Sequence, residues 1–213
     1  MNLQAFEFNL FGEKTYVAWD NDTHEGAVID PGMSSESEQR VFADFISRNG
    51  IKLKYLLYTH LHVDHTFGHE FIHDTYGLEA TAHPADAPLG EARDAQARMF
   101  RLRIPALKPL HIATQLTDNE TLPLGNETIQ VICVPGHSPG SVAYYCPESS
   151  FVLTGDALFH SGIGRTDLPG GNHRQLVDSI RNRLFTLPPD TEVYPGHGSP
   201  TTIGDEERTN PYV

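Results

Sequence analysis

The sequence feature that most limits the possible folds of this chain is a short segment rich in histidine. His60, His62, Asp64 and His65 fall within six residues, directly after the apolar stretch 55–58. If that stretch is a strand, side-chain alternation beyond its end sends the first three of these residues to one side, and a turn into a helix redirects the fourth. Imidazole nitrogen and carboxylate oxygen are ligands that zinc, iron and manganese accept. The spacing favours one loop that presents ligands to two adjacent metal positions over a histidine-rich surface turn.

Three further residues share a sequence setting that is typical of functional loops. His137 and His197 each follow Pro-Gly, and Asp156 follows Thr-Gly, in each case just beyond the end of an expected strand. Glycine lets the backbone turn sharply at such points, and loops at one edge of a sheet commonly assemble sites. Taken singly, each could be an ordinary loop residue. Together with the first cluster, all three are predicted to be metal ligands.

Apolar periodicity indicates that strands precede helices in both halves of the chain. The expected strands are residues 3–8, 16–19, 26–29, 55–58, 128–134, 141–146, 151–154 and a last strand at 191–194. Helical patterns follow Ser35, whose spacing from Glu38 predicts a capping box, recur over 67–76 and 85–100, and follow Asn172. This order predicts an α/β fold with two packed sheets and helices outside them, built as a single domain over residues 1–213.

Composition excludes several classes of protein. The 15 Lys and Arg residues against 28 Asp and Glu give a formal net charge of −13, which opposes binding to nucleic acid. The sequence has neither a long apolar run nor a basic, apolar start, so we expect neither a membrane protein nor a secreted one. Its 2 cysteines form no disulfide framework, which favours the cytoplasm.

The ordered set of histidines and aspartates resembles the metallo-β-lactamase superfamily. The resemblance runs from the Asp-Pro-Gly turn at 30–32 to the end of the chain. It implies a four-layer αβ/βα sandwich, in which two mixed β-sheets carry helices on their outer faces. It also implies two metal sites, the first held by His60, His62 and His137, the second by Asp64, His65 and His197, with Asp156 bridging both.

Within that superfamily, the chain is similar to glyoxalase II-like (hydroxyacylglutathione hydrolase-like) thioester hydrolases. The carboxylate at 156 and the stretch 155–170 carry this likeness. That group has a basic residue nine positions after the bridging aspartate, where it grips a carboxylate of glutathione, and here the position is Arg165. Asp167 and Ser199 stand where the group has tyrosines. The chain ends soon after His197, so we expect the helical C-terminal domain of glyoxalase II to be absent.

The resemblance implies a dinuclear hydrolase for a small-molecule thioester of S-acylglutathione type. Two divalent metal ions would be held, zinc in the first place and iron or manganese as alternatives. A hydroxide between the metals would act as the nucleophile, oriented by Asp64 and Asp156 as the catalytic carboxylates. The acyl group, the thiol carrier and the oligomeric state stay open.

Two alternatives are weighed against this interpretation. Persulfide dioxygenases of the same fold also carry a stretch like Gly-Arg-Thr-Asp at 164–167, and the likeness to them implies one iron held by His60, His137 and Asp156. A binding module without catalysis is the other alternative, which the complete ligand set disfavours. Outside the site, the apolar stretch at 99–104 is interpreted as core rather than as the wall of a pocket.

Overall fold

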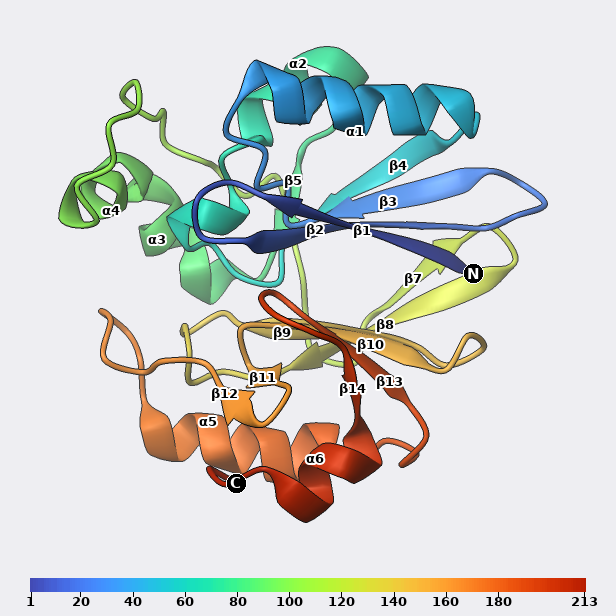
Figure 1. Ribbon diagram of the computed structural model, residues 1–213, viewed down its shortest axis with the longest axis vertical. Helices are drawn as coiled ribbons and strands as arrows, with labels where there is room; N and C mark the ends of the chain where they lie inside the picture. Colours follow the sequence, from blue (N-terminus) through green and yellow to red (C-terminus); the bar gives the residue numbers. More distant parts are fainter.

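Strands in both halves of the chain are buried on both faces, and this burial explains the layered architecture. In β3 (Glu25–Ile29), Val28 packs on one side of the sheet, whereas Ala27 and Ile29 pack on the other. In β10 (Phe151–Gly155), neighbouring residues divide in the same way between two apolar clusters. A sheet that is apolar on both faces needs cover on both. The computed structural model, which describes residues 1–213, places the two sheets face to face with helices outside them (Figure 1).

The first sheet has six strands in the order β1-β2-β3-β4-β5-β6. Its other strands are β1 (Asn2–Phe8), β2 (Glu13–Trp19), β4 (Lys52–Leu57), β5 (Ala80–Ala82) and β6 (Thr114–Gln115). The strands β1 to β3 pair antiparallel, and β3 to β6 pair parallel. Two helices, α1 (Glu36–Arg48) and α2 (His69–Tyr76), cover the outer face, where Phe42 and Ile72 are fully buried.

The second sheet also has six strands, in the order β14-β13-β10-β9-β8-β7. Its other strands are β7 (Thr121–Leu124), β8 (Glu127–Cys133), β9 (Val142–Cys146), β13 (Glu192–Pro195) and β14 (Thr201–Thr202). Only β10 and β13 pair parallel, so this sheet is mixed as well. The helices α5 (His173–Ser179) and α6 (Ile203–Thr209) cover its outer face (Figure 1). The expected four-layer αβ/βα sandwich is therefore confirmed.

Helix ends follow the expected local signals. The Ser35 hydroxyl accepts a hydrogen bond from the Glu38 backbone N–H at 3.3 Å, and the Glu38 carboxylate accepts one from the Ser35 N–H at 3.0 Å, so the capping box is confirmed. The Asn172 side chain caps α5 by accepting from the Gln175 N–H at 3.1 Å. No helix of the chain combines the length and the apolar character that crossing a membrane requires.

Three sequence-based expectations need correction. The helix expected over 85–100 is broken at Ala92 into α3 (Ala87–Glu91) and α4 (Arg93–Met99), after a 3₁₀ turn at Pro84–Asp86. The strand expected last in the chain is followed by β14 and α6. The stretch at 99–104 is not core, because Met99 is 51% exposed and no residue of that stretch is fully buried.

A two-stranded sheet of β11 (Leu158–Phe159) and β12 (Gly162–Ile163) completes the fold. It lies between β10 and the loop that carries Arg165, close to the edge where the loops of both large sheets meet.

Candidate metal centre

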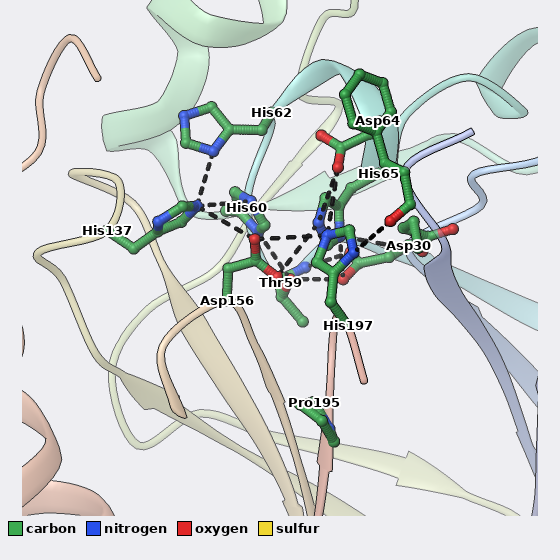
Figure 2. Close-up of polar contacts among 12 residues, drawn as sticks. Asp30, Thr59, His60, His62, Asp64, His65, His137, Asp156, Pro195 and His197 are labelled. Atoms are coloured by element: carbon green, nitrogen blue, oxygen red, sulfur yellow. Dashed lines mark hydrogen bonds and ion pairs between the residues drawn. The ribbon is translucent and has the colours of Figure 1, made fainter. Parts of the chain in front are cut away.

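Loops that follow four strands bring all seven predicted ligands to one place between the two sheets. The loop after β4 carries His60 to His65, and a 3₁₀ turn at Val63–His65 redirects the last of them, as expected. His137 follows β8, Asp156 follows β10 and His197 follows β13. Figure 2 shows these side chains converging from both halves of the chain.

Three histidines form the first group of the centre. Nδ1 of His62 lies 2.8 Å from Nε2 of His137, and that nitrogen lies 3.2 Å from Nε2 of His60. All three residues are buried, and their ligand atoms lie within 4.8 Å of one another. This group could hold one metal ion.

Asp64, His65 and His197 form the second group, also within 4.8 Å. Nε2 of His197 lies 3.3 Å from Oδ2 of Asp64, and Nε2 of His65 lies 3.8 Å from the same oxygen. This set combines two imidazoles with a carboxylate and could hold a second metal ion.

Asp156 lies between the two groups (Figure 2). Its Oδ2 is 3.6 Å from Nε2 of His137 and also 3.6 Å from Nε2 of His197, while its Oδ1 is 3.5 Å from Nε2 of His65. One carboxylate thus contacts both groups, which is the geometry that the predicted bridging role requires.

The outer nitrogen of most of these imidazoles is already engaged, which orients the inner nitrogen toward the centre. Nδ1 of His60 contacts the Thr59 hydroxyl at 3.0 Å, and Nδ1 of His137 contacts the Arg165 carbonyl oxygen at 2.7 Å. Nδ1 of His197 contacts the Phe11 carbonyl oxygen at 3.2 Å. Such outer partners set the tautomer of a metal-binding imidazole.

Burial and charge prepare these groups for a cation. Burial lowers the pKa of His60 well below its usual range and that of His62 to about 3, so both imidazoles offer free lone pairs. Burial acts to raise the pKa of Asp156, but the surrounding imidazoles, His65 foremost, outweigh it and hold that pKa below its usual value. Nε2 of His65 and Oδ1 of Asp156 are buried without a hydrogen-bond partner. Neighbouring carboxylates outweigh burial and raise the pKa of His65 and of His197, so these two imidazoles bind protons that a metal ion would displace. Neutral imidazoles in the first group beside ionised carboxylates with unsatisfied atoms fit divalent metal ions.

Asp30 is a buried residue of the site that sequence reasoning missed. Its carboxylate accepts hydrogen bonds from the backbone N–H of Thr59 at 2.7 Å and from the Thr59 hydroxyl at 2.5 Å, and it lies 3.1 Å from Nδ1 of His65. Asp30 is also close to His60, but it faces the outer nitrogen of His65, so we assign it a positioning role. The only sequence signal that could have indicated this role of Asp30 was its place in the Asp-Pro-Gly turn at the end of a strand.

The substitution Asp30→Asn is expected to weaken the second metal site about 10- to 100-fold, because outer partners of metal-binding histidines are worth that much. Zinc affinity measured by competition with a chromophoric chelator checks this. Asp44→Asn, at an exposed position on α1, is the matched control. Equal zinc affinity in the wild type and the Asp30→Asn variant would show that Asp30 does not position His65.

Glycines allow the loops of the two sheets to approach closely. A Cβ atom at Gly196 would lie 2.3 Å from Oδ1 of Asp156, so only glycine fits there. Gly155 has a φ of +50°, and a Cβ there would lie 2.3 Å from the Thr59 hydroxyl oxygen. The glycine turn at Gly196 therefore makes room for Asp156, and the turn at Gly155 makes room for Thr59 from the other half of the chain.

Arg165 lies in the loop beside His137, but its guanidinium is already paired. Its Nε lies 2.7 Å from Oδ1 of Asp167, and its Nη2 lies 2.7 Å from Oδ2 of the same carboxylate. Both side chains are more than half exposed. The role of Arg165 as an anion clamp stays a prediction, because a substrate carboxylate would have to compete with Asp167.

Comparisons with known proteins agree with this fold. A family model described as the metallo-beta-lactamase superfamily matches residues 10–197. The hydroxyacylglutathione hydrolase GloC of Haemophilus influenzae is 36% identical over 215 residues, which span 100% of this chain and 98% of that protein.

Two solved structures each superpose on 99% of this chain. The first is the BLEG-1 B3 metallo-beta-lactamase, of which 99% of the chain is covered, with a TM-score of 0.88 and 32% sequence identity. The second is TTHA1623 in a di-iron-bound form, of which 100% of the chain is covered, with a TM-score of 0.86 and 37% sequence identity.

Proposed function

The chain belongs to the metallo-β-lactamase superfamily, and on that premise we propose that it hydrolyses small-molecule thioesters of S-acylglutathione type. The observation that carries this proposal is the Asp156 carboxylate, which lies 3.6 Å from a histidine of each ligand group. One carboxylate between two groups suits a pair of divalent metal ions, with zinc proposed first and iron or manganese as alternatives. The 36% identity to GloC over the whole chain supports a substrate of the glyoxalase II kind.

The carboxylates of the site provide the negative charge that the reaction needs. When bound, divalent metal ions lower the pKa of water from about 15.7 to about 7 and polarise a carbonyl oxygen. Asp64 and Asp156 are held ionised, because neighbouring imidazoles outweigh the effect of burial and lower the pKa of each carboxylate. Both can accept a hydrogen bond from the attacking water and orient its lone pair toward the thioester carbonyl carbon.

Water is proposed as the nucleophile because the cysteine and serine side chains that could attack the thioester are not activated. Burial raises the pKa of the Cys133 thiol to about 11 and raises that of Cys146 further, so neither forms a thiolate near neutral pH. Ser138, next to His137, donates its hydroxyl to Asp86 at 2.8 Å, so a carboxylate rather than a histidine holds its proton. These residues serve the fold.

Steady-state hydrolysis of S-lactoylglutathione by zinc-loaded and iron-loaded protein tests the proposal. Nitrocefin, a chromogenic β-lactam, serves as a second substrate because a B3 lactamase is among the similar structures. We expect thioester cleavage that exceeds β-lactam cleavage. β-Lactam cleavage without thioester cleavage would contradict the proposal.

Persulfide oxidation is the second candidate function. The stretch 164–167, through which the chain resembles persulfide dioxygenases, forms the Arg165–Asp167 pair at 2.7 Å and lies against His137. This candidate requires one iron held by His60, His137 and Asp156. His62, which lies 2.8 Å from His137, favours the hydrolase because it completes a three-histidine group. Oxygen uptake with glutathione persulfide and iron-loaded protein, without thioester cleavage, would establish the dioxygenase instead.

Arg165→Met is expected to raise KM about tenfold for a thioester that carries a carboxylate, with kcat comparatively unaffected. The loss of a hydrogen bond to a charged group costs about 1.5–3 kcal/mol, and competition from Asp167 brings the effect to the lower end. Asp167→Ala should lower KM, because it frees the guanidinium. A neutral thioester is the control and should show no change. A fall in kcat alone, with KM unchanged, would contradict the clamp.

A further inference from the structure

A cavity of about 370 Å³ opens beside the first ligand group, on the side of His62. In Figure 2, His62 lies at the edge of the cluster next to His137 and away from His197. The helices α3 and α4 form one wall, and the loop at 168–170 forms the other. The residues that line the cavity include His62, Leu89, Ala92, Met99, Pro139 and Leu168.

The walls of this cavity are almost entirely apolar. Gln96 and His62 are the polar side chains among its lining residues, and no lysine, arginine or carboxylate lines it. The Gln96 amide is fully occupied, because its oxygen accepts from the Val63 N–H at 3.1 Å and its nitrogen donates to the Leu89 carbonyl oxygen at 2.9 Å. A charged group that entered the cavity would therefore lose its water and would find only Nε2 of His62, which has no hydrogen-bond partner, to replace it.

Two arginine side chains near the cavity are also unable to bind an anionic group inside it. Arg93, at the start of α4, is fully buried, and its guanidinium bonds to Glu70 at 2.7 Å and to the Thr66 carbonyl oxygen at 2.7 Å. Arg165 does not line the cavity, and its exposed guanidinium is paired with Asp167. No charged side chain therefore recognises a ligand inside the cavity, whose walls favour apolar groups.

We propose that this cavity takes the acyl group of the substrate and that the preferred substrates are thioesters with an apolar acyl chain. The inference rests on the proposed thioester hydrolysis and deepens it. The charged thiol carrier would stay on the open side, near Arg165. In the reaction, water adds to the acyl carbon, the carbon–sulfur bond breaks and a proton passes to the sulfur. The products are a carboxylic acid with its chain in the cavity and a free thiol.

A series of neutral thioesters tests the acyl assignment. The probes are S-acyl-N-acetylcysteamines with acetyl, butyryl, hexanoyl and octanoyl groups, whose carrier has no charge for Arg165 to bind. Burial of each added methylene is expected to raise kcat/KM about fourfold until the cavity is full. Equal kcat/KM from acetyl to octanoyl, with measurable hydrolysis throughout, would overturn the acyl pocket and leave the thioester reaction intact.

Substitutions that fill the cavity provide the second arm. Ala92→Phe, and independently Ala95→Phe at a more exposed lining position, should reduce the preference for hexanoyl over acetyl at least about tenfold. Ala113→Phe, at an exposed position that does not line the cavity, is the control and should keep the preference. An unchanged preference in both lining variants would overturn the proposal.

Binding of the product class separates the two proposals. Inhibition constants of butyrate, hexanoate and octanoate are measured on metal-loaded protein, or dissociation constants by calorimetry where no turnover occurs. We expect each methylene to tighten binding about fourfold and Ala92→Phe to abolish this trend. Chain-dependent binding without cleavage of any thioester would overturn the thioester reaction and support the cavity as an apolar ligand site. If neither chain-dependent binding nor thioester cleavage is observed, both the acyl cavity and the thioester reaction are overturned.

Discussion

Asp156→Ala is expected to release both metal ions and to lower thioester hydrolysis about a thousandfold or more. The Asp156 carboxylate contacts His137 in one group and His65 and His197 in the other, at 3.5–3.6 Å. In the proposed bridging role, its removal would take one ligand from each site and leave the imidazoles without the negative charge that lies between them. Bound metal contributes several kcal/mol to transition-state stabilisation, and each 1.36 kcal/mol is a factor of ten in rate. Metal content by elemental analysis and steady-state rates measure both effects.

Two companion variants distinguish loss of the bridge from general damage. His62→Ala should weaken the first group alone, because the second keeps Asp64, His65 and His197. Asp167→Ala removes an exposed carboxylate outside both groups and should keep full metal content. Two metal equivalents per chain in Asp156→Ala would remove Asp156 from the bridging position.

Removal of the metal ions is expected to lower the melting temperature by about 8–16 °C as well as to abolish activity. A ligand at 1,000 times its dissociation constant stabilises the folded state by about 4 kcal/mol, and 1 kcal/mol shifts Tm by roughly 2–4 °C at this chain length. The effect arises because His65 Nε2 and Asp156 Oδ1, which face the centre, are buried without hydrogen-bond partners. Thermal unfolding before and after dialysis against a chelator gives the shift.

Zinc added back to the dialysed protein should restore both Tm and activity. The Asp156→Ala variant is the matched control, since it should show little change in Tm on dialysis. A wild-type melting temperature that is unaffected by the chelator would mean that the seven residues form a stable polar cluster without metal.

The sequence predicted that these candidate ligands come together because the relevant signals are local. Each candidate ligand lies in a loop that follows a strand, either β4 of the first sheet or β8, β10 or β13 of the second. Strands that are buried on both faces, such as β3, indicated the layers by the same kind of short-range pattern. Capping at Ser35 and Asn172 depends on residues three positions apart and was equally visible.

Features that depend on distant contacts were missed or misjudged. The role of Asp30 arises from its contact with His65, and the pairing of Arg165 with Asp167 became visible only in the folded loop. The stretch at 99–104 has the composition of core, yet α4 begins after a break at Ala92, and its Met99 lines a cavity. Periodicity describes one element at a time and carries no information about such neighbours.

Metal content per chain, determined by elemental analysis after expression without added metal, tests the proposed dinuclear centre. Two contiguous ligand groups that share Asp156 predict two equivalents of divalent metal per chain. Zinc, iron or manganese would each satisfy that prediction, provided that the total is two. A single iron per chain, unchanged by the substitution His197→Ala, would contradict it and indicate a mononuclear centre.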